Sequence, residues 1–160
     1  MRFKVIIAAF ALTLIAAGCR QPVNDYAYKN LNRIKGWTDG TPVVLDFEMT
    51  DTTGACELYL AGEIKRQRSA TKSEGFPINL TFTAPDGSRY ADSVTLPVNV
   101  VKGKGISSTS HGVMNVEWPY RKNIYNKIPG NWSVMITKGD PERDYSNIIG
   151  LGIHCRQRKL

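Results

Sequence analysis

The sequence contains few of the residues on which metal sites depend. Its 160 residues include two histidines, His111 and His154, and three cysteines. The histidines lie far apart, and the cysteines do not have the spacing of a zinc site. The acidic residues Asp46, Asp51 and Asp140 do not follow the EF-hand spacing either. The sequence therefore predicts a protein without a metal ion or another cofactor.

Local motifs of catalysis are also missing. Ser107, Ser108 and Ser110 precede His111, but no acidic residue that would orient the histidine stands nearby. Residues 102–105 combine lysine and glycine, yet their spacing differs from a phosphate-binding loop and no helical pattern follows. A triad assembled from distant segments is the remaining route to catalysis. We predict that the protein is not an enzyme.

An apolar run near the start of the chain is too short to span a membrane. Arg2 and Lys4 precede the run, which extends over residues 5–17, and Cys19 follows it. A membrane-spanning helix needs about 20 apolar residues, whereas this order of segments is typical of a secretory signal peptide. Small residues directly before Cys19 resemble the bacterial lipobox. That resemblance implies removal of residues 1–18 and attachment of lipid, such as palmitate, to Cys19, which anchors the chain to a membrane.

The residues after the predicted anchor indicate which membrane the protein is attached to and on which side. Arg20 stands where an inner-membrane retention signal has aspartate, so the lipobox resemblance favours the outer membrane. An acidic cluster typical of surface display is missing there, which favours the periplasmic side, with surface exposure as the alternative.

Basic clusters occur at residues 65–72 and 156–159. In an exported protein we expect their partners to be anionic lipids, glycans or acidic proteins, and not nucleic acid.

From Trp37 onward, apolar and polar residues alternate with a period of two, and no helical period is sustained. The strands predicted from this alternation are residues 43–49, 56–60, 77–84, 90–101, 113–120, 132–136 and 149–155. Pro97 indicates a sheet edge or a break in its strand. The pattern predicts an all-β, antiparallel, jelly-roll-like β-sandwich of about seven to eight strands. It occupies residues 37–160 as a single domain, after a lipid anchor and tether at residues 19–36.

The two cysteines that remain after Cys19 lie in phase with the apolar faces of their strands. Cys56 alternates with leucines, and Cys155 follows an alternating apolar series. Both side chains are therefore expected inside the sandwich, where they form a disulfide or remain buried thiols.

Aromatic residues provide candidates for glycan binding, because their rings stack on sugars. Trp118 and Trp132 are in phase with aliphatic neighbours, which favours core packing. Tyr59 is expected to point outward beside Glu57, so it is the candidate for stacking on a glycan.

Several segments, taken in order, resemble the gliding-motility lipoprotein family of Bacteroidetes (GldH type). The segments are VLDFEMTDT at 44–52, LYL at 58–60, residues 79–87, DSVTLP at 92–97, GKG at 103–105 and IIGLGI at 148–153. The resemblance implies an outer-membrane lipoprotein that acts as a structural or accessory subunit of a gliding-motility or type IX secretion-related envelope complex. The resemblance therefore implies that other envelope proteins are its partners, and it implies no catalytic residues in this chain. A glycan-binding surface lipoprotein is the alternative.

Overall fold

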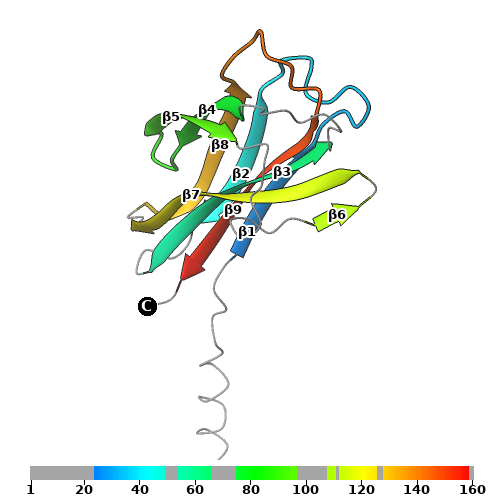
Figure 1. Ribbon diagram of the computed structural model, residues 1–160. Coiled ribbons are helices and arrows are strands. Elements are labelled where there is room, and N and C mark those ends of the chain that lie inside the picture. Colours follow the sequence, from blue (N-terminus) through cyan, green and yellow to red (C-terminus); the bar gives the residue numbers. More distant parts are fainter. Residues whose placement is uncertain are drawn as a thin grey trace, which may run out of the picture.

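The computed structural model describes residues 24–49, 54–65, 75–96, 108–110, 112–125 and 128–158. These residues form nine strands (Figure 1). The strands are β1 (Asn24–Asn30), β2 (Val43–Met49), β3 (Ala55–Lys65), β4 (Phe76–Thr83), β5 (Arg89–Leu96), β6 (Ser108–Ser110), β7 (Val113–Tyr125), β8 (Gly130–Lys138) and β9 (Ile148–Arg158). Within the described ranges, the chain contains no helix of the length and hydrophobicity that a membrane crossing requires.

The strands form two antiparallel sheets packed as a sandwich. The first sheet has the order β1-β9-β3-β7-β6, and the second has the order β2-β8-β4-β5. Successive strands alternate between the sheets except at the β4–β5 hairpin and at β6–β7 (Figure 1). Without the three-residue strand β6, this order is that of an eight-stranded jelly roll. The predicted all-β antiparallel sandwich is therefore confirmed, with β1 and β6 as strands that the sequence pattern did not predict.

The core lies between the sheets because alternate residues of the strands point inward. In β2 the burial alternates without exception, with Val43, Leu45, Phe47 and Met49 buried and the residues between them exposed. Strand β5 differs, since only Leu96 among its eight residues is buried. It pairs with β4 alone and is an edge of the second sheet. Pro97 and the rest of the strand predicted up to residue 101 lie outside the described residues.

Strand β1 corrects the predicted boundary of the domain. The sequence assigned residues 19–36 to a tether, but Asn24–Asn30 pair with β9 along their whole length. The ring of Tyr28 lies over Gly150 and Gly152, where the Cβ atom of any larger residue would come within 2.6 Å of it. The polar composition of β1 concealed this pairing, because an edge strand contributes few residues to the core. The domain therefore includes residues 24–36.

Cys56 and Cys155 meet inside the sandwich, as their phase predicted. They lie on the neighbouring strands β3 and β9, are almost fully buried, and their Sγ atoms are 2.9 Å apart. Both are free thiols in this structure, so the disulfide remains a prediction. The hydrogen bond with Cys56, together with burial, raises the pKa of Cys155.

Candidate functional site

A pocket of about 470 Å³ opens where β5 of the second sheet approaches β7 of the first. Its size falls in the range of small-molecule sites, which is about 300–1,000 Å³. Apolar and aromatic side chains make up most of its lining, with two charged residues among them. The lining residues are Met49, Leu58, Phe82, Tyr90, Ala91, Asp92, Tyr120, Arg121, Ile124, Tyr125 and Trp132. We call this site the aromatic pocket.

Two pairs of stacked rings line the aromatic pocket. The ring centroids of Tyr90 and Trp132 are 6.0 Å apart with an interplanar angle of 26°, and those of Phe82 and Tyr120 are 5.6 Å apart at 11°. The Trp132 indole donates a hydrogen bond to the Ile128 carbonyl oxygen at 3.1 Å, which holds its ring plane in place. Tyr90 is 52% exposed. The pocket therefore presents aromatic rings whose orientation is set before any ligand arrives.

A polar triad of Asp92, Tyr120 and Arg121 stands beside these rings. One carboxylate oxygen of Asp92 accepts hydrogen bonds from the Tyr120 hydroxyl at 2.8 Å and from the Arg121 guanidinium at 3.0 Å. Asp92 belongs to β5, whereas its two partners belong to β7, so the triad joins the two sheets. Asp92 pairs with Leu80, a fully buried residue, and thus occupies a core-facing position of its strand.

Irregular pairing of β7 explains how two adjacent residues reach the same carboxylate. Neighbouring side chains of a regular strand point to opposite faces of the sheet. Here the β3 segment 56–59 is paired with the β7 segment 119–124, which is longer by two residues. Such β-bulges change the direction of side chains, and they bring both Tyr120 and Arg121 to Asp92. Asn123 in the same segment has a φ of 56°, in the left-handed region.

The charge state of the triad follows from its hydrogen bonds. The Arg121 guanidinium, followed by the Tyr120 hydroxyl, lowers the pKa of Asp92. Burial and then the hydrogen bond to Asp92 raise the pKa of Tyr120 to about 12. At neutral pH Asp92 is therefore an anion that accepts, while Tyr120 and Arg121 donate. A ligand at this wall meets both acceptors and donors.

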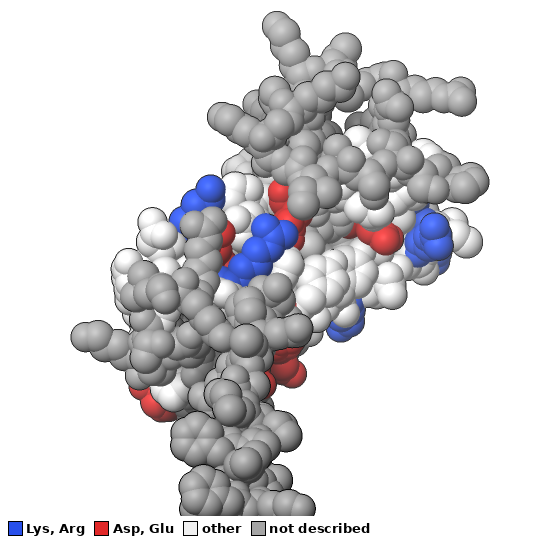
Figure 2. All heavy atoms as spheres, turned by 90° about the horizontal axis from the view of Figure 1, so that it is seen from below, with Lys and Arg blue, Asp and Glu red and all other residues white. Residues whose placement is uncertain are grey.

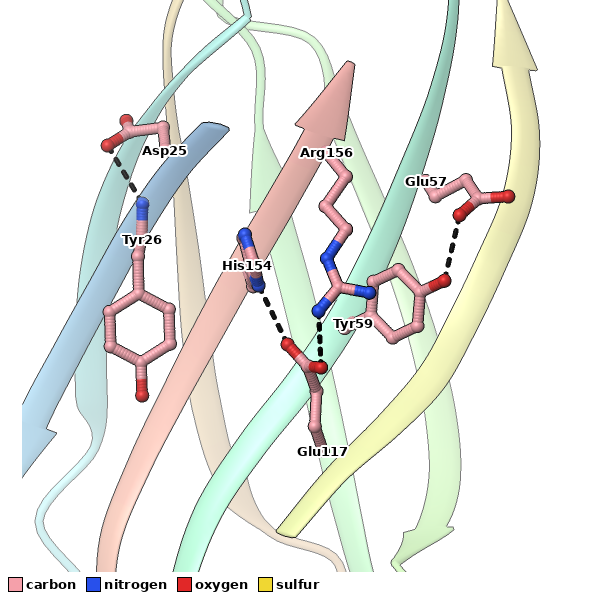
Figure 3. A network of polar contacts seen from close by, with 7 residues as sticks. All are labelled: Asp25, Tyr26, Glu57, Tyr59, Glu117, His154 and Arg156. Carbon is pink, nitrogen blue, oxygen red and sulfur yellow. Dashed lines mark hydrogen bonds and ion pairs between the residues drawn. The ribbon is translucent and has the colours of Figure 1, made fainter. Parts of the chain in front are cut away.

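Tyr59, the residue predicted to stack on a glycan, lies elsewhere. It belongs to the outer face of the first sheet, which faces away from the core (Figure 3). The Arg156 guanidinium covers its ring at 4.2 Å from the centroid, and its hydroxyl donates to Glu57 at 2.8 Å. That hydrogen bond raises the pKa of Tyr59. One face of the Tyr59 ring and its hydroxyl group thus already have partners within the chain.

The other polar residues of this outer face are engaged with each other. Glu117 accepts a hydrogen bond from Arg156 at 2.5 Å, and it contacts Nδ1 of His154 at 2.7 Å (Figure 3). His154 belongs to β9, and its side chain is only 18% exposed because Glu117 and the Tyr26 ring pack against it. Arg156, assigned to a basic cluster at the C-terminus, is part of β9 and of this network.

Charges of both signs are mixed on the surface. Figure 2 shows basic and acidic side chains interspersed among uncharged residues on the described part of that side of the molecule. Across the described ranges, no group of three or more His, Cys, Asp or Glu residues is arranged to hold a metal ion. Cys19, His111 and residues 102–105 lie outside those ranges.

The sequence identified the aromatic residues of the pocket only in part. Trp132 was considered among the aromatic residues, and the burial of Trp118 and Trp132 confirms their predicted packing in the core. Tyr90 and Asp92 were missed. Their signal was their phase, since both lie at the same alternate positions of the strand as Val94 and Leu96 and thus face inward.

Comparisons of the chain with protein-family models, with curated proteins and with solved structures gave no match. The resemblance to gliding-motility lipoproteins therefore stays a prediction from the sequence segments alone. The aromatic pocket has to be interpreted from its own chemistry.

Proposed function

We propose that this chain is a non-catalytic lipoprotein, anchored in the outer membrane through Cys19, whose jelly-roll domain binds a glycan in the aromatic pocket. The observation that carries the proposal is the combination of two stacked ring pairs with the Asp92–Tyr120–Arg121 triad in one pocket of about 470 Å³.

The chemistry of the pocket is complementary to a sugar. A sugar ring has apolar faces edged by hydroxyl groups, so it needs flat apolar surfaces together with donors and acceptors. The exposed rings of Tyr90 and Tyr125 provide such surfaces, and Trp132 supports the Tyr90 ring by stacking against it. Asp92 accepts hydrogen bonds from hydroxyl groups, and Arg121, whose side chain is 60% exposed, donates them. Pockets that are mainly apolar with a few polar groups are the usual form of small-molecule sites.

The test uses full-length lipoprotein in detergent, analysed by affinity electrophoresis in gels that contain polysaccharides of bacterial envelopes and plant cell walls. We expect retardation in at least one gel, and Tyr90→Ala should abolish it because a ring of the pocket is lost. Tyr26→Ala is a matched control, since Tyr26 is 53% exposed and Tyr90 52%, but Tyr26 lies on the outer face of the first sheet. Loss of retardation in Tyr26→Ala or Tyr59→Ala alone would place the glycan on that outer face. Unretarded wild-type protein would contradict glycan binding.

The anchor is tested separately by labelling cells with a fatty-acid analogue. We expect label on the wild-type protein and none on Cys19→Ala, because the lipobox resemblance assigns the lipid to this cysteine. Cys56→Ala is the control and should keep the label, since Cys56 is 2% exposed inside the domain. Equal labelling of wild type and Cys19→Ala would contradict the lipoprotein proposal.

A second candidate function is that of an accessory subunit in a gliding-motility or type IX secretion-related envelope complex. The exposed edge strand β5 favours it, because an unpaired edge offers backbone groups to a strand of another protein. Purification from native membranes through a C-terminal tag tests this role. We expect envelope proteins of such a complex in stoichiometric amounts, and their absence would leave glycan binding as the function.

A further inference from the structure

We propose that the aromatic pocket is one half of a longer binding site, and that the ligand is an acidic oligosaccharide whose negatively charged groups lie against Lys122 and Arg121. This inference rests on the proposed glycan binding and adds the class of glycan and the length of the site.

A second hollow of about 620 Å³ adjoins the aromatic pocket. Four residues line both hollows, namely Asp92, Tyr120, Arg121 and Ile124, whereas Val94, Lys122 and Asn123 line the second hollow alone. The triad therefore forms a wall common to both. A ligand that contacts both the aromatic rings and Lys122 therefore extends beyond a single sugar ring.

The two hollows differ in chemistry. Five aromatic side chains line the aromatic pocket, but Tyr120 is the only one of them that also lines the second hollow. In their place the second hollow has the Lys122 ammonium and the Asn123 amide. The first hollow thus provides flat apolar surfaces for a sugar ring, and the second provides hydrogen-bond donors for its substituents.

The charge of the second hollow favours an anion. Asp92 is the one carboxylate among the lining residues of both hollows, and it is paired with Arg121 at 3.0 Å. Lys122 forms no ion pair with a carboxylate of the described residues, so its positive charge remains unneutralised by them. A carboxylate or sulfate group on the sugar would complement this charge, whereas the hydroxyl groups of a neutral glycan would not.

The backbone of β7 builds this wall in an unusual way. The segment 119–124 contains the two residues by which β7 exceeds β3, and Asn123 within it has a left-handed φ of 56°. Bulges and left-handed residues of this kind concentrate at binding sites, where the surrounding structure maintains them. Here they direct a tyrosine, an arginine, a lysine and an asparagine into two adjoining hollows.

The experiment titrates full-length lipoprotein in detergent with a panel of uronic-acid oligosaccharides, and with the same oligosaccharides after their carboxylates have been reduced to neutral alcohols. We expect the acidic forms to bind more tightly, and to lose this advantage in high salt because the exposed charges are screened. Oligosaccharides should also bind more tightly than the single uronic acid, since only they reach both hollows.

Variants of Lys122 separate this inference from glycan binding in general. Lys122→Ala should weaken binding of the acidic form about two- to fivefold, the loss expected for one exposed ion pair, and leave the neutral form unchanged. Lys122→Arg should restore the preference. Lys29→Ala should not alter it, because this exposed lysine lies on β1, which is separated from β7 by β9 and β3. Equal binding of acidic and neutral forms, or an unchanged preference in Lys122→Ala, would overturn the inference and leave the proposed function standing. If no glycan binds at all, both proposals fail.

Discussion

The aromatic pocket and the outer face of the first sheet contain similar residues but differ in how these are used. Each combines tyrosines with a carboxylate and an arginine. On the outer face, Tyr28 lies across two glycines of β9, and Arg156 covers Tyr59. In the pocket, the Tyr90 and Tyr125 side chains remain 52% and 65% exposed beside an open cavity. Tyr26 on the outer face is as exposed as Tyr90, at 53%, but it lines neither hollow. The two regions therefore differ in whether exposed rings stand at the wall of a cavity, and not in the number of aromatic residues.

The predicted bridge between the buried Cys56 and Cys155 has the largest expected effect. If the bridge forms during export, alkylation of the unfolded, unreduced protein should add no label at these cysteines. Reduction should then lower the free energy of unfolding by about 4 to 5 kcal/mol, because a long loop is released in the unfolded chain. Intact mass and urea denaturation measure these two effects. Two added labels would show that the cysteines are thiols and end the prediction.

The next largest effect is the loss of stability expected when either of two buried tryptophans is replaced. Trp132 is 8% exposed at the pocket and Trp118 is 7% exposed in the first sheet. Replacing either by alanine removes a large packed side chain, so we expect each to lose about 3 to 5 kcal/mol of stability in urea denaturation. Only Trp132→Ala should also abolish glycan binding, measured under conditions in which both variants are folded. A loss of less than about 1 kcal/mol in Trp132→Ala would mean that this ring is not part of the core.

Gly152→Ala tests the outer face alone. The added Cβ atom would lie 2.6 Å from the Tyr28 ring and 2.9 Å from the Ala27 carbonyl oxygen, so β1 must shift. We expect a loss of about 1 to 3 kcal/mol in urea denaturation, with glycan binding unchanged. Gly62→Ala is the control, since its Cβ atom would come no closer than 3.2 Å to its neighbours and should cost less. Weaker glycan binding in Gly152→Ala would show that the two regions are coupled.

The smallest effect concerns the pH dependence of the polar triad. The pKa of Asp92 is lowered in the folded state, so its contribution to stability is present above its unfolded pKa of about 3.9. This contribution disappears as the pH falls through the lower, folded pKa. At pH 7 we expect Asp92→Asn to lose about 0.2 to 1 kcal/mol, because the pair is partly exposed.

Urea denaturation of both proteins from pH 7 down to pH 2 measures this dependence. The difference between wild type and Asp92→Asn should shrink below about pH 4. A difference that stays constant over this range would show that the charge of Asp92 does not hold the two sheets together at this edge.

Much of the fold could be predicted from the sequence because the determining pattern is local. In β2, each inward residue differs in polarity from its neighbours, and the structure buries the predicted positions Val43, Leu45, Phe47 and Met49. Strand β1 could not be predicted in this way, because Tyr26 and Tyr28 pack outward against β9 and only Ala27 and Leu31 contact the core. Its place depends on glycines more than a hundred residues later in the chain.

The sequence by itself determined the class of fold, the core-facing phase of most strands, and the inward position of both Cys56 and Cys155. These follow from the two-residue period of a strand, which any extended chain obeys before it meets a partner. The aromatic pocket was decided by the tertiary structure alone. It requires the jelly-roll order that places the edge strand β5 opposite β7, and the two extra residues of β7 that turn Tyr120 and Arg121 towards Asp92. Both depend on pairing between segments distant in sequence, which no local pattern encodes.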